Sequence, residues 1–247
     1  MPDPVIIGRR YNGPPGSANG GYACGLFAAL ARPMLGTSPD GKASDIAVQL
    51  LSPPPLETPL TATSAGRRVA FWHGETLVAS ASHGAVPAQA CPFVAPAGAR
   101  EAEKAYAGHS SHPFGTCYVC GPRHRDRGLR LAPGPVPGRT DTAACTWTPG
   151  PEHAGEDGLV RPELIWAVLD CPGGWTLDPV SAPLVLGRMT ARIRRLPSPG
   201  ETTVVVATGS PGGGRTAQCE TAVFRQDGTE LARSSAVWVR RDEKAQP

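Results

Sequence analysis

Two segments of the chain carry apolar residues nearly all round a helical turn. The first covers residues 19–31 and stops before Pro33, and the second covers residues 161–170 and stops before Pro172. Pro162 falls in the first turn of the second segment, where its missing backbone N–H costs nothing. Helices that are apolar on every side belong in a protein interior. We therefore predict two buried helices.

Each predicted helix is followed by strand-like segments separated by turns that contain Gly and Pro. These two residue types are the strongest punctuators of local structure, and short segments between them indicate strands and hairpins. We predict an antiparallel meander after each helix. Its strands cover residues 46–51, 57–64, 69–73 and 76–82 after the first helix, and residues 187–196, 201–208, 216–225 and 229–240 after the second.

The two series match in order, which indicates an internal duplication. The sequence LSPPPLET at residues 51–58 lies over LPSPGET at residues 196–202, and GETLVAS at 74–80 lies over GTELARS at 228–234. The offset grows along the repeat, so we assign about ten extra residues to the strand at 216–225. A repeat of this length is a duplicated domain, not a solenoid unit.

The duplication defines the domain organisation. We predict an N-terminal half at residues 1–84, a connector at 85–115 and a C-terminal half at 116–247. The connector is rich in Ala, Pro and Gly and carries a short helix near residues 100–107. A helix packed on its own antiparallel strands gives each sheet the cover that it needs, so the fold class is α+β.

Composition narrows the class of protein. The 247 residues include 30 Gly and 28 Pro, nearly twice average usage, and this favours many short elements. Hydrophobic residues make up 40% and the net charge is +3, which excludes wholesale disorder and is too weak to indicate a nucleic-acid partner. No apolar run reaches membrane-spanning or signal-peptide length, so we expect a cytoplasmic protein without a membrane partner. Seven cysteines, an odd number, favour reduced thiols or one metal site over disulfides.

Four motifs carry a resemblance to a known family. They are Asn12-Gly-Pro-Pro-Gly16, Asn19-Gly-Gly-Tyr22, Trp166-Ala-Val-Leu-Asp170, and the strand series that begins at Arg195-Leu-Pro-Ser-Pro-Gly200 and ends at Trp238-Val. With them the chain resembles the hotdog fold, specifically acyl-CoA thioesterases of the double-hotdog type, over about residues 8–84 and 116–240. The resemblance implies two tandem halves, each a central helix wrapped by an antiparallel sheet. It also implies an enzyme without a cofactor, a thioester of coenzyme A or an acyl carrier as substrate, and a homodimer or higher oligomer.

The resemblance also implies where the site lies. Family sites form where two hotdog units meet: one unit offers an Asn and the N–H of a Gly at its helix start, and the other offers a helix carboxylate. The usual His-Gly-Gly helix start is Asn19-Gly20-Gly21 here, so the family His is missing. By position, the resemblance implies that the catalytic candidates are Asp170, Asn12 and Gly20, and that the substrate-binding candidates are Asn19, Gly21, Thr190 and Arg192.

The two halves are complementary at these positions. Ala28 stands in the first half where the second half has Asp170, and Pro162, which has no N–H, stands where the first half has Gly20. We therefore expect one complete site, made from both halves.

The chemistry of thioester hydrolysis fits such a site. Negative charge builds on the carbonyl oxygen, and preorganised donors such as a helix-start N–H stabilise it. Asp170 would act as general base or nucleophile, and its apolar helix predicts a raised pKa. The residues also have purely structural interpretations: a solvent-facing helix end for Asp170, a turn for Asn12, close packing for Gly20, a helix N-cap for Asn19 and a solvated strand face for Arg192.

The pair Cys117-Tyr-Val-Cys120-Gly121 has the spacing of a metal-binding knuckle. The residues His109, His112 and His124 lie near it in sequence, and Cys145 and Cys171 would join only if the fold brings them close. Because no second CxxC follows at zinc-ribbon spacing, we favour a reduced pair at the first strand of the second half, without metal. Three other functions stay open: an enoyl-thioester hydratase or dehydratase, a non-catalytic acyl-thioester-binding protein, and a zinc-stapled structural domain.

Overall fold

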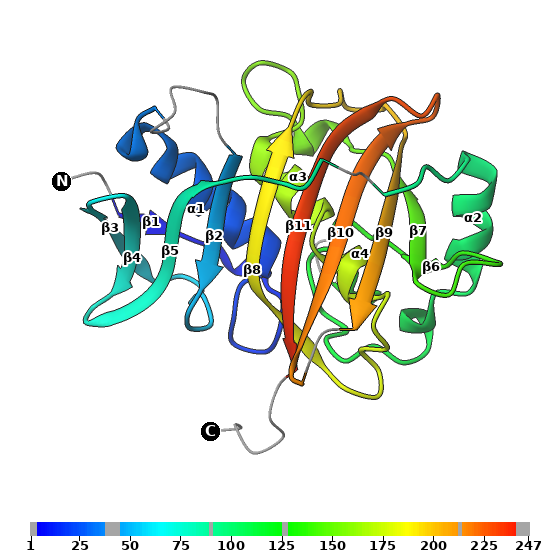
Figure 1. The fold of residues 1–247 in the computed structure, drawn as a ribbon, viewed down its shortest axis with the longest axis horizontal. Coiled ribbons are helices and arrows are strands. Elements are labelled where there is room, and N and C mark those ends of the chain that lie inside the picture. Colours follow the sequence, from blue (N-terminus) through cyan, green and yellow to red (C-terminus); the bar gives the residue numbers. More distant parts are fainter. Residues whose placement is uncertain (1–3, 38–44, 89–90, 125–127, 212–213, 241–247) are drawn as a thin grey trace.

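An antiparallel sheet of eleven strands forms the centre of the computed structural model, which describes residues 4–37, 45–88, 91–124, 128–211 and 214–240 (Figure 1). The first half contributes β1 (Val5–Ile6), β2 (Asp45–Leu50), β3 (Pro59–Ala65), β4 (Arg68–His73) and β5 (Thr76–Gly84). The second half contributes β6 (Gly134–Pro135), β7 (Thr142–Trp147), β8 (Leu184–Ile193), β9 (Thr203–Pro211), β10 (Thr216–Arg225) and β11 (Glu230–Arg240). The helices are α1 (Gly20–Leu35), α2 (Pro96–Lys104), α3 (Pro162–Val168) and α4 (Cys171–Gly174), with single 3₁₀ turns at Arg9–Tyr11, Ala107–His109 and Pro151–His153.

The strand order is β1-β3-β4-β5-β2-β8-β11-β10-β9-β7-β6, and the two sides of the β2–β8 junction mirror each other except for the additional edge strand β6. The two halves join where β2 pairs with β8, antiparallel, from Ile46↔Ala191 to Gln49↔Arg188. This confirms the predicted α+β fold of two tandem halves, a double hotdog. The extra residues were predicted in the strand at 216–225 alone, but they are spread more widely: β10 has 10 residues against 6 in β4, β9 has 9 against 7 in β3, and the turns before and after β10 take the rest.

The predicted meanders need one correction. Strands β3, β4 and β5 form a meander, as do β9, β10 and β11, but the first predicted strand after each helix joins the other end of its meander: β2 pairs with β5, and β8 with β11. The links after β2 and β8 are rich in proline, which lacks a ladder N–H and leaves the sheet. The chain therefore crosses to the far edge before it starts the meander.

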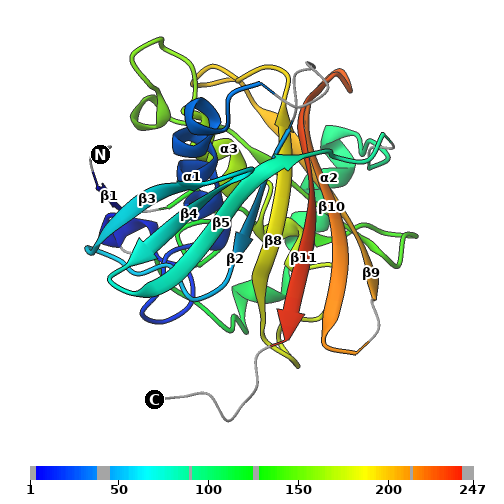
Figure 2. The same cartoon turned by 60° about the vertical axis from the view of Figure 1, so that its left-hand side comes forward.

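The two central helices, α1 and α3, pack against each other and against the same face of the sheet (Figures 1 and 2). Helix α1 runs past the predicted stop at Pro33 and ends at Leu35, followed by Gly36, whose φ of 65° is one that glycine adopts freely. Pro33 is tolerated because it falls in the last turn, where one missing hydrogen bond costs little. Helix α3 is shorter than predicted and ends at Val168, ahead of Pro172.

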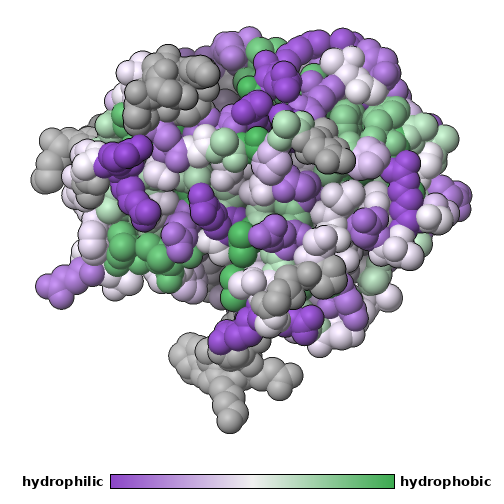
Figure 3. All heavy atoms as spheres, viewed as in Figure 1, coloured by the Kyte–Doolittle hydropathy of each residue, from purple (hydrophilic) through white to green (hydrophobic). Residues whose placement is uncertain are grey.

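The connector after β5 crosses the opposite face of the sheet, in front of the strands in Figure 1, and leads to α2. Its helix lies where one was predicted but begins earlier, at Pro96. A second apolar cluster forms under it and includes Val94, Ala99, Val206 and Phe224. On the face shown in Figure 3, hydrophobic residues gather in separate patches among hydrophilic ones. Within the described ranges, none of the helices is long and apolar enough to cross a membrane.

Candidate functional site

The carboxylate of Asp170 lies where the end of α3 meets the start of α1. Its Oδ2 accepts hydrogen bonds from the N–H of Gly21 at 2.9 Å and from Asn19 Nδ2 at 3.0 Å. The side chain is buried, and its Oδ1 has no hydrogen-bond partner among the described residues. The acid and its donors therefore come from different halves of the chain, as the complementary losses at Ala28 and Pro162 predict.

The helix start explains why these donors are in place. The Oδ1 of Asn19 caps α1 by accepting from the N–H of Tyr22 at 2.9 Å, so the amide nitrogen is turned toward Asp170. Asn19 thus serves both as N-cap and as a partner of the acid. Gly21 permits the close approach of α1 and α3, because a Cβ there would stand 2.6 Å from the carbonyl oxygen of Trp166.

The acid sits at a break in the helix rather than inside it. Asp170 has φ −84° and ψ −78°, between the end of α3 and the single turn of α4. Pro172 causes the break, since its ring has no N–H to continue the helix and collides with the preceding turn. Burial raises the pKa of Asp170 to about 7, against the hydrogen bond from Gly21, which lowers it. At neutral pH this carboxyl therefore exchanges a proton readily.

A cavity of about 340 Å³ opens beside Asp170 between the two halves. Its walls are mostly apolar and include Pro54, Phe114, Trp175, Leu184, Leu186 and Trp238. Gly20, the first residue of α1, also faces it. The N–H of Gly20 belongs to the first turn, whose donors have no partner within the helix. A site with one acid, helix-start donors and an apolar pocket can bind an acyl group and polarise its carbonyl.

The structure places Asn12 outside the lining of this cavity. Its Nδ2 donates to the backbone oxygen of Thr116 at 2.9 Å, and its own backbone oxygen accepts from the N–H of Tyr118 at 2.8 Å. Asn12 therefore clamps the loop that carries Cys117. The side-chain nitrogen and the backbone oxygen of Asn12 are both engaged by that loop, and no hydrogen bond between Asn12 and Asp170 is found among the described residues.

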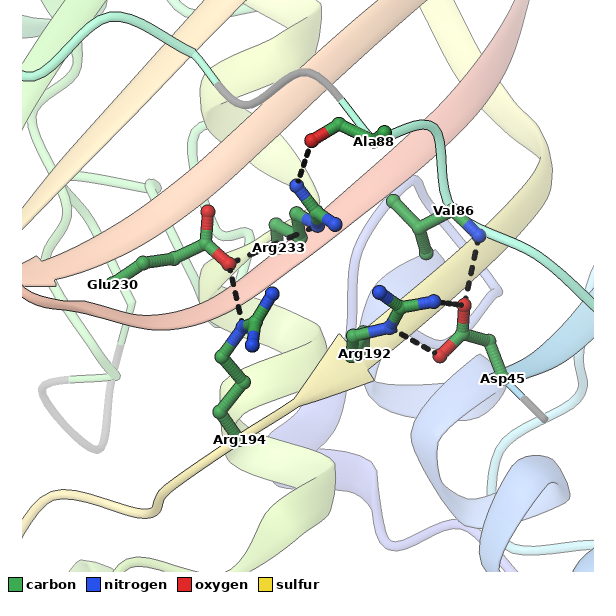
Figure 4. A network of polar contacts seen from close by, with 7 residues as sticks. All are labelled: Asp45, Val86, Ala88, Arg192, Arg194, Glu230 and Arg233. Atoms are coloured by element: carbon green, nitrogen blue, oxygen red, sulfur yellow. Dashed lines mark hydrogen bonds and ion pairs between the residues drawn. The ribbon is translucent and has the colours of Figure 1, made fainter. Parts of the chain in front are cut away.

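Two more candidates, Thr190 and Arg192, lie on the face of the sheet opposite the central helices. Thr190 and Arg192 alternate along β8 with Met189 and Ala191, which pack in the core beneath the helices. Arg192 binds Asp45 of β2 through two 2.8 Å contacts, and Asp45 also accepts from the N–H of Val86 (Figure 4). These residues join the two halves and the connector. Neither Thr190 nor Arg192 lines the cavity, because strand alternation turns their side chains to the other face of the sheet.

The corresponding position between the two halves lacks both the acid and the helix-start donor. Ala28 is buried there without an acid, and Pro162 begins α3 without an N–H. The stacked rings of Tyr11 and Tyr22, with centroids 3.7 Å apart, pack close by, and Arg161 reaches Tyr11. This position therefore cannot repeat the arrangement found around Asp170.

Three buried cysteines form a cluster next to the acid: Cys117, Cys120 and Cys171, with sulfurs that all lie within 4.8 Å of one another. Sequence reasoning left Cys171 conditional on the fold, and the break at Asp170 is what turns it toward the CxxC loop. That loop forms turns, not the start of a strand as predicted. Hydrogen bonds from the thiols of Cys120 and Cys171 hold the pKa of Cys117 well below its usual value.

Of the other candidate metal ligands, one lies beside the cluster and three lie elsewhere. His112 reaches the cluster, with Nε2 3.3 Å from the sulfur of Cys120. His109 and His124 contact backbone oxygens elsewhere, at Glu103 and Arg10. Cys145 lies apart in β7. The signal for His112 was its place five residues before the CxxC pair.

Comparison with known proteins gives similarity in structure but not in sequence. No protein-family model and no curated protein sequence matches the chain. Solved structures match over nearly its whole length. A protein of Novosphingobium aromaticivorans with a provisional thioesterase name has 17% identity, covers 97% of this chain and 95% of its own, and gives a TM-score of 0.63. The TesB protein of Mycobacterium avium subspecies paratuberculosis has 10% identity, coverage of 93% and 90%, and a TM-score of 0.59.

An acyl-CoA thioesterase II of Mycobacterium marinum has 14% identity, coverage of 92% and 90%, and a TM-score of 0.58. At such identities the similarity establishes the fold.

Proposed function

We propose that this protein hydrolyses acyl thioesters at the composite site around Asp170. The observation that carries the proposal is a buried carboxylate from one half, held by the helix start of the other half at the wall of an apolar cavity. The names of three similar structures, all thioesterases or TesB proteins, support it. The thioester carrier is coenzyme A or an acyl-carrier protein, which present the same thioester linkage.

The roles of the residues follow from their places. The thioester carbonyl accepts a hydrogen bond from the N–H of Gly20, at the positive end of the α1 dipole. Asp170 takes a proton from a water molecule, and the resulting hydroxide attacks the carbonyl carbon. The tetrahedral intermediate then breaks its C–S bond, and the departing thiolate takes the proton from Asp170. Asn19 and the N–H of Gly21 keep the carboxylate in place during these steps.

The cavity limits the acyl group. Its volume of about 340 Å³ lies near the lower end of the range for small-molecule sites. Trp175, Trp238 and Phe114 line it, so we propose a compact or aromatic acyl group. A long chain would have to leave the cavity.

The test is hydrolysis of short, medium, long and aromatic acyl-CoAs, followed through the release of free thiol. We expect turnover of compact substrates by the wild type and loss of at least about 100-fold in Asp170→Asn. The matched control is Asp227→Asn, at an exposed hairpin turn where the side chain accepts from Thr229, and it keeps full activity. Equal turnover in Asp170→Asn and wild type contradicts the assignment. Binding without turnover of any acyl-CoA or acyl-carrier substrate identifies a non-catalytic acyl-thioester-binding protein instead.

A hydratase is disfavoured by the histidine nearest the site. Both ring nitrogens of His112 are engaged, one by Cys120 and the other by the N–H of Phe114. It is therefore not free to act as a base on an enoyl group. Incubation with enoyl-CoA, followed by mass spectrometry for addition of water, tests this directly.

A further inference from the structure

The three sulfurs of the cysteine cluster have the spacing of ligands around one metal ion. Tetrahedral zinc with bonds of about 2.3 Å to sulfur separates its sulfurs by about 3.8 Å. The sulfurs of Cys117 and Cys171 lie 3.8 Å apart, and that of Cys120 lies within 4.8 Å of both. Two ligands come from a loop after the connector and the third from α4. The fold alone brings them together.

Two side-chain nitrogens, Asn19 Nδ2 and His112 Nε2, lie beside the sulfurs and can donate to them. Asn19 Nδ2 lies 3.9 Å from the sulfur of Cys117 and 3.7 Å from that of Cys171. His112 accepts from the N–H of Phe114 at Nδ1, which puts the ring proton on Nε2, facing Cys120. Cysteine binds a metal ion as thiolate, and a buried thiolate needs a cation to compensate its charge.

The CxxC loop is held in shape before any ligand binds. Asn12 fixes both sides of Cys117 through Thr116 and Tyr118. The N–H of Gly121 donates to the carbonyl oxygen of Cys117 at 2.9 Å, and a Cβ at Gly121 would stand 2.7 Å from the carbonyl oxygen of Gly115. A loop closed this tightly presents its two sulfurs without further ordering.

We propose that Cys117, Cys120 and Cys171 bind one zinc ion, with its fourth position open to the cavity. Thiolates select zinc and other thiophilic metals over magnesium or calcium. All three cysteines line the cavity, so a water or a ligand in the cavity completes the tetrahedron. His112 stands outside the ligand set and holds Cys120 by a hydrogen bond. This inference does not depend on thioester hydrolysis, and its readouts do not use activity.

The first test is the metal content of untagged full-length protein, made in zinc-supplemented medium and dialysed against metal-free buffer. Elemental mass spectrometry should give about one zinc per chain. Cys117→Ser, Cys120→Ser and Cys171→Ser should each lose most of it. Cys91→Ser is the matched control, because Cys91 is also buried and bonded to polar groups but lies outside the cluster, and it keeps the metal.

The second test uses the wild type only, so it stands where a variant fails to fold. Cobalt added to the metal-free protein should produce a thiolate-to-cobalt charge-transfer band and the strong visible absorption of a tetrahedral ion. Wild type that retains no zinc after dialysis overturns the proposal, as does an octahedral cobalt spectrum. A disulfide between Cys117 and Cys171 in freshly isolated protein, seen as a loss of two hydrogens in peptide mass spectrometry, also overturns it.

Discussion

Replacement of Gly21 by alanine tests how α1 and α3 hold the acid. The new Cβ would lie against the Cβ of Asp170 and 2.6 Å from the carbonyl oxygen of Trp166, whereas ordinary contact begins at 3.4 Å. The helices must therefore separate by about 0.8 Å. That stretches the 2.9 Å bond from the N–H of Gly21 to Asp170 to about 3.7 Å, beyond hydrogen-bond range.

The expected costs follow from this separation. Overpacking costs about 1–3 kcal/mol, which lowers the melting temperature of a chain of this size by about 2–12 °C. Misplacement of a reacting group by about 1 Å reduces the rate by about 100-fold. Thermal unfolding followed by circular dichroism measures the first effect, and acyl-CoA hydrolysis measures the second.

Gly25→Ala is the matched control at the same helix crossing. A Cβ at Gly25 would stand 2.7 Å from the Cα of Glu163 and 2.9 Å from the Cβ of Trp166, one turn away from Asp170. We expect a similar loss of stability with much more activity left than in Gly21→Ala. Wild-type melting temperature and wild-type turnover in Gly21→Ala would refute the reasoning.

Four further predictions use the same site and sheet. The pKa of about 7 for Asp170 predicts a hydrolysis rate that rises with pH to a plateau above about 7, and a flat profile would rule out the acid as base. Because this raised pKa means that the native state keeps a proton that the unfolded state loses, the free energy of unfolding falls as pH rises from about 4 to 7, and Asp170→Asn removes that slope in urea titrations. Asn19→Ser keeps a capping oxygen and loses the amide donor to Asp170, so turnover should fall at least about tenfold with a melting temperature near that of wild type; equal turnover speaks against the contact. Arg192→Ala leaves the buried Asp45 without its cation and should lower the melting temperature by about 2–8 °C for a loss of about 1–2 kcal/mol, with KM unchanged, whereas a raised KM would restore its substrate role.

The candidate site was partly predictable, because residues close together in sequence determine where a helix starts and whether an acid is surrounded by apolar side chains. Asn19-Gly20-Gly21 reads as a capped helix start, and an acid among apolar residues reads as a buried group with a raised pKa. The donor to that acid was not predictable: the N–H of Gly21 donates to Asp170 because the approach of the two helices brings it to face the carboxylate.

Thr190 and Arg192 show where local pattern fails. Both residues lie on the first strand after the helix that carries the acid. Whether their side chains reach the cavity depends on which face of this strand packs against the core. The β-bulge near Gly187, where β8 shifts register against β11, interrupts the simple alternation from the sequence. Asn12 fails for another reason, because its partner loop lies 104 residues away.

The sequence by itself determined the duplication, the two buried helices and most strands, because periodicity and turn chemistry act over a few residues. It also determined that only one half kept the acid and only the other kept the helix-start N–H. The tertiary structure decided which groups touch: that β2 and β8 join the halves, that Pro172 breaks the helix at Asp170, and that Cys171 meets the CxxC loop. Such contacts depend on how distant segments pack, and packing is a property of the whole chain.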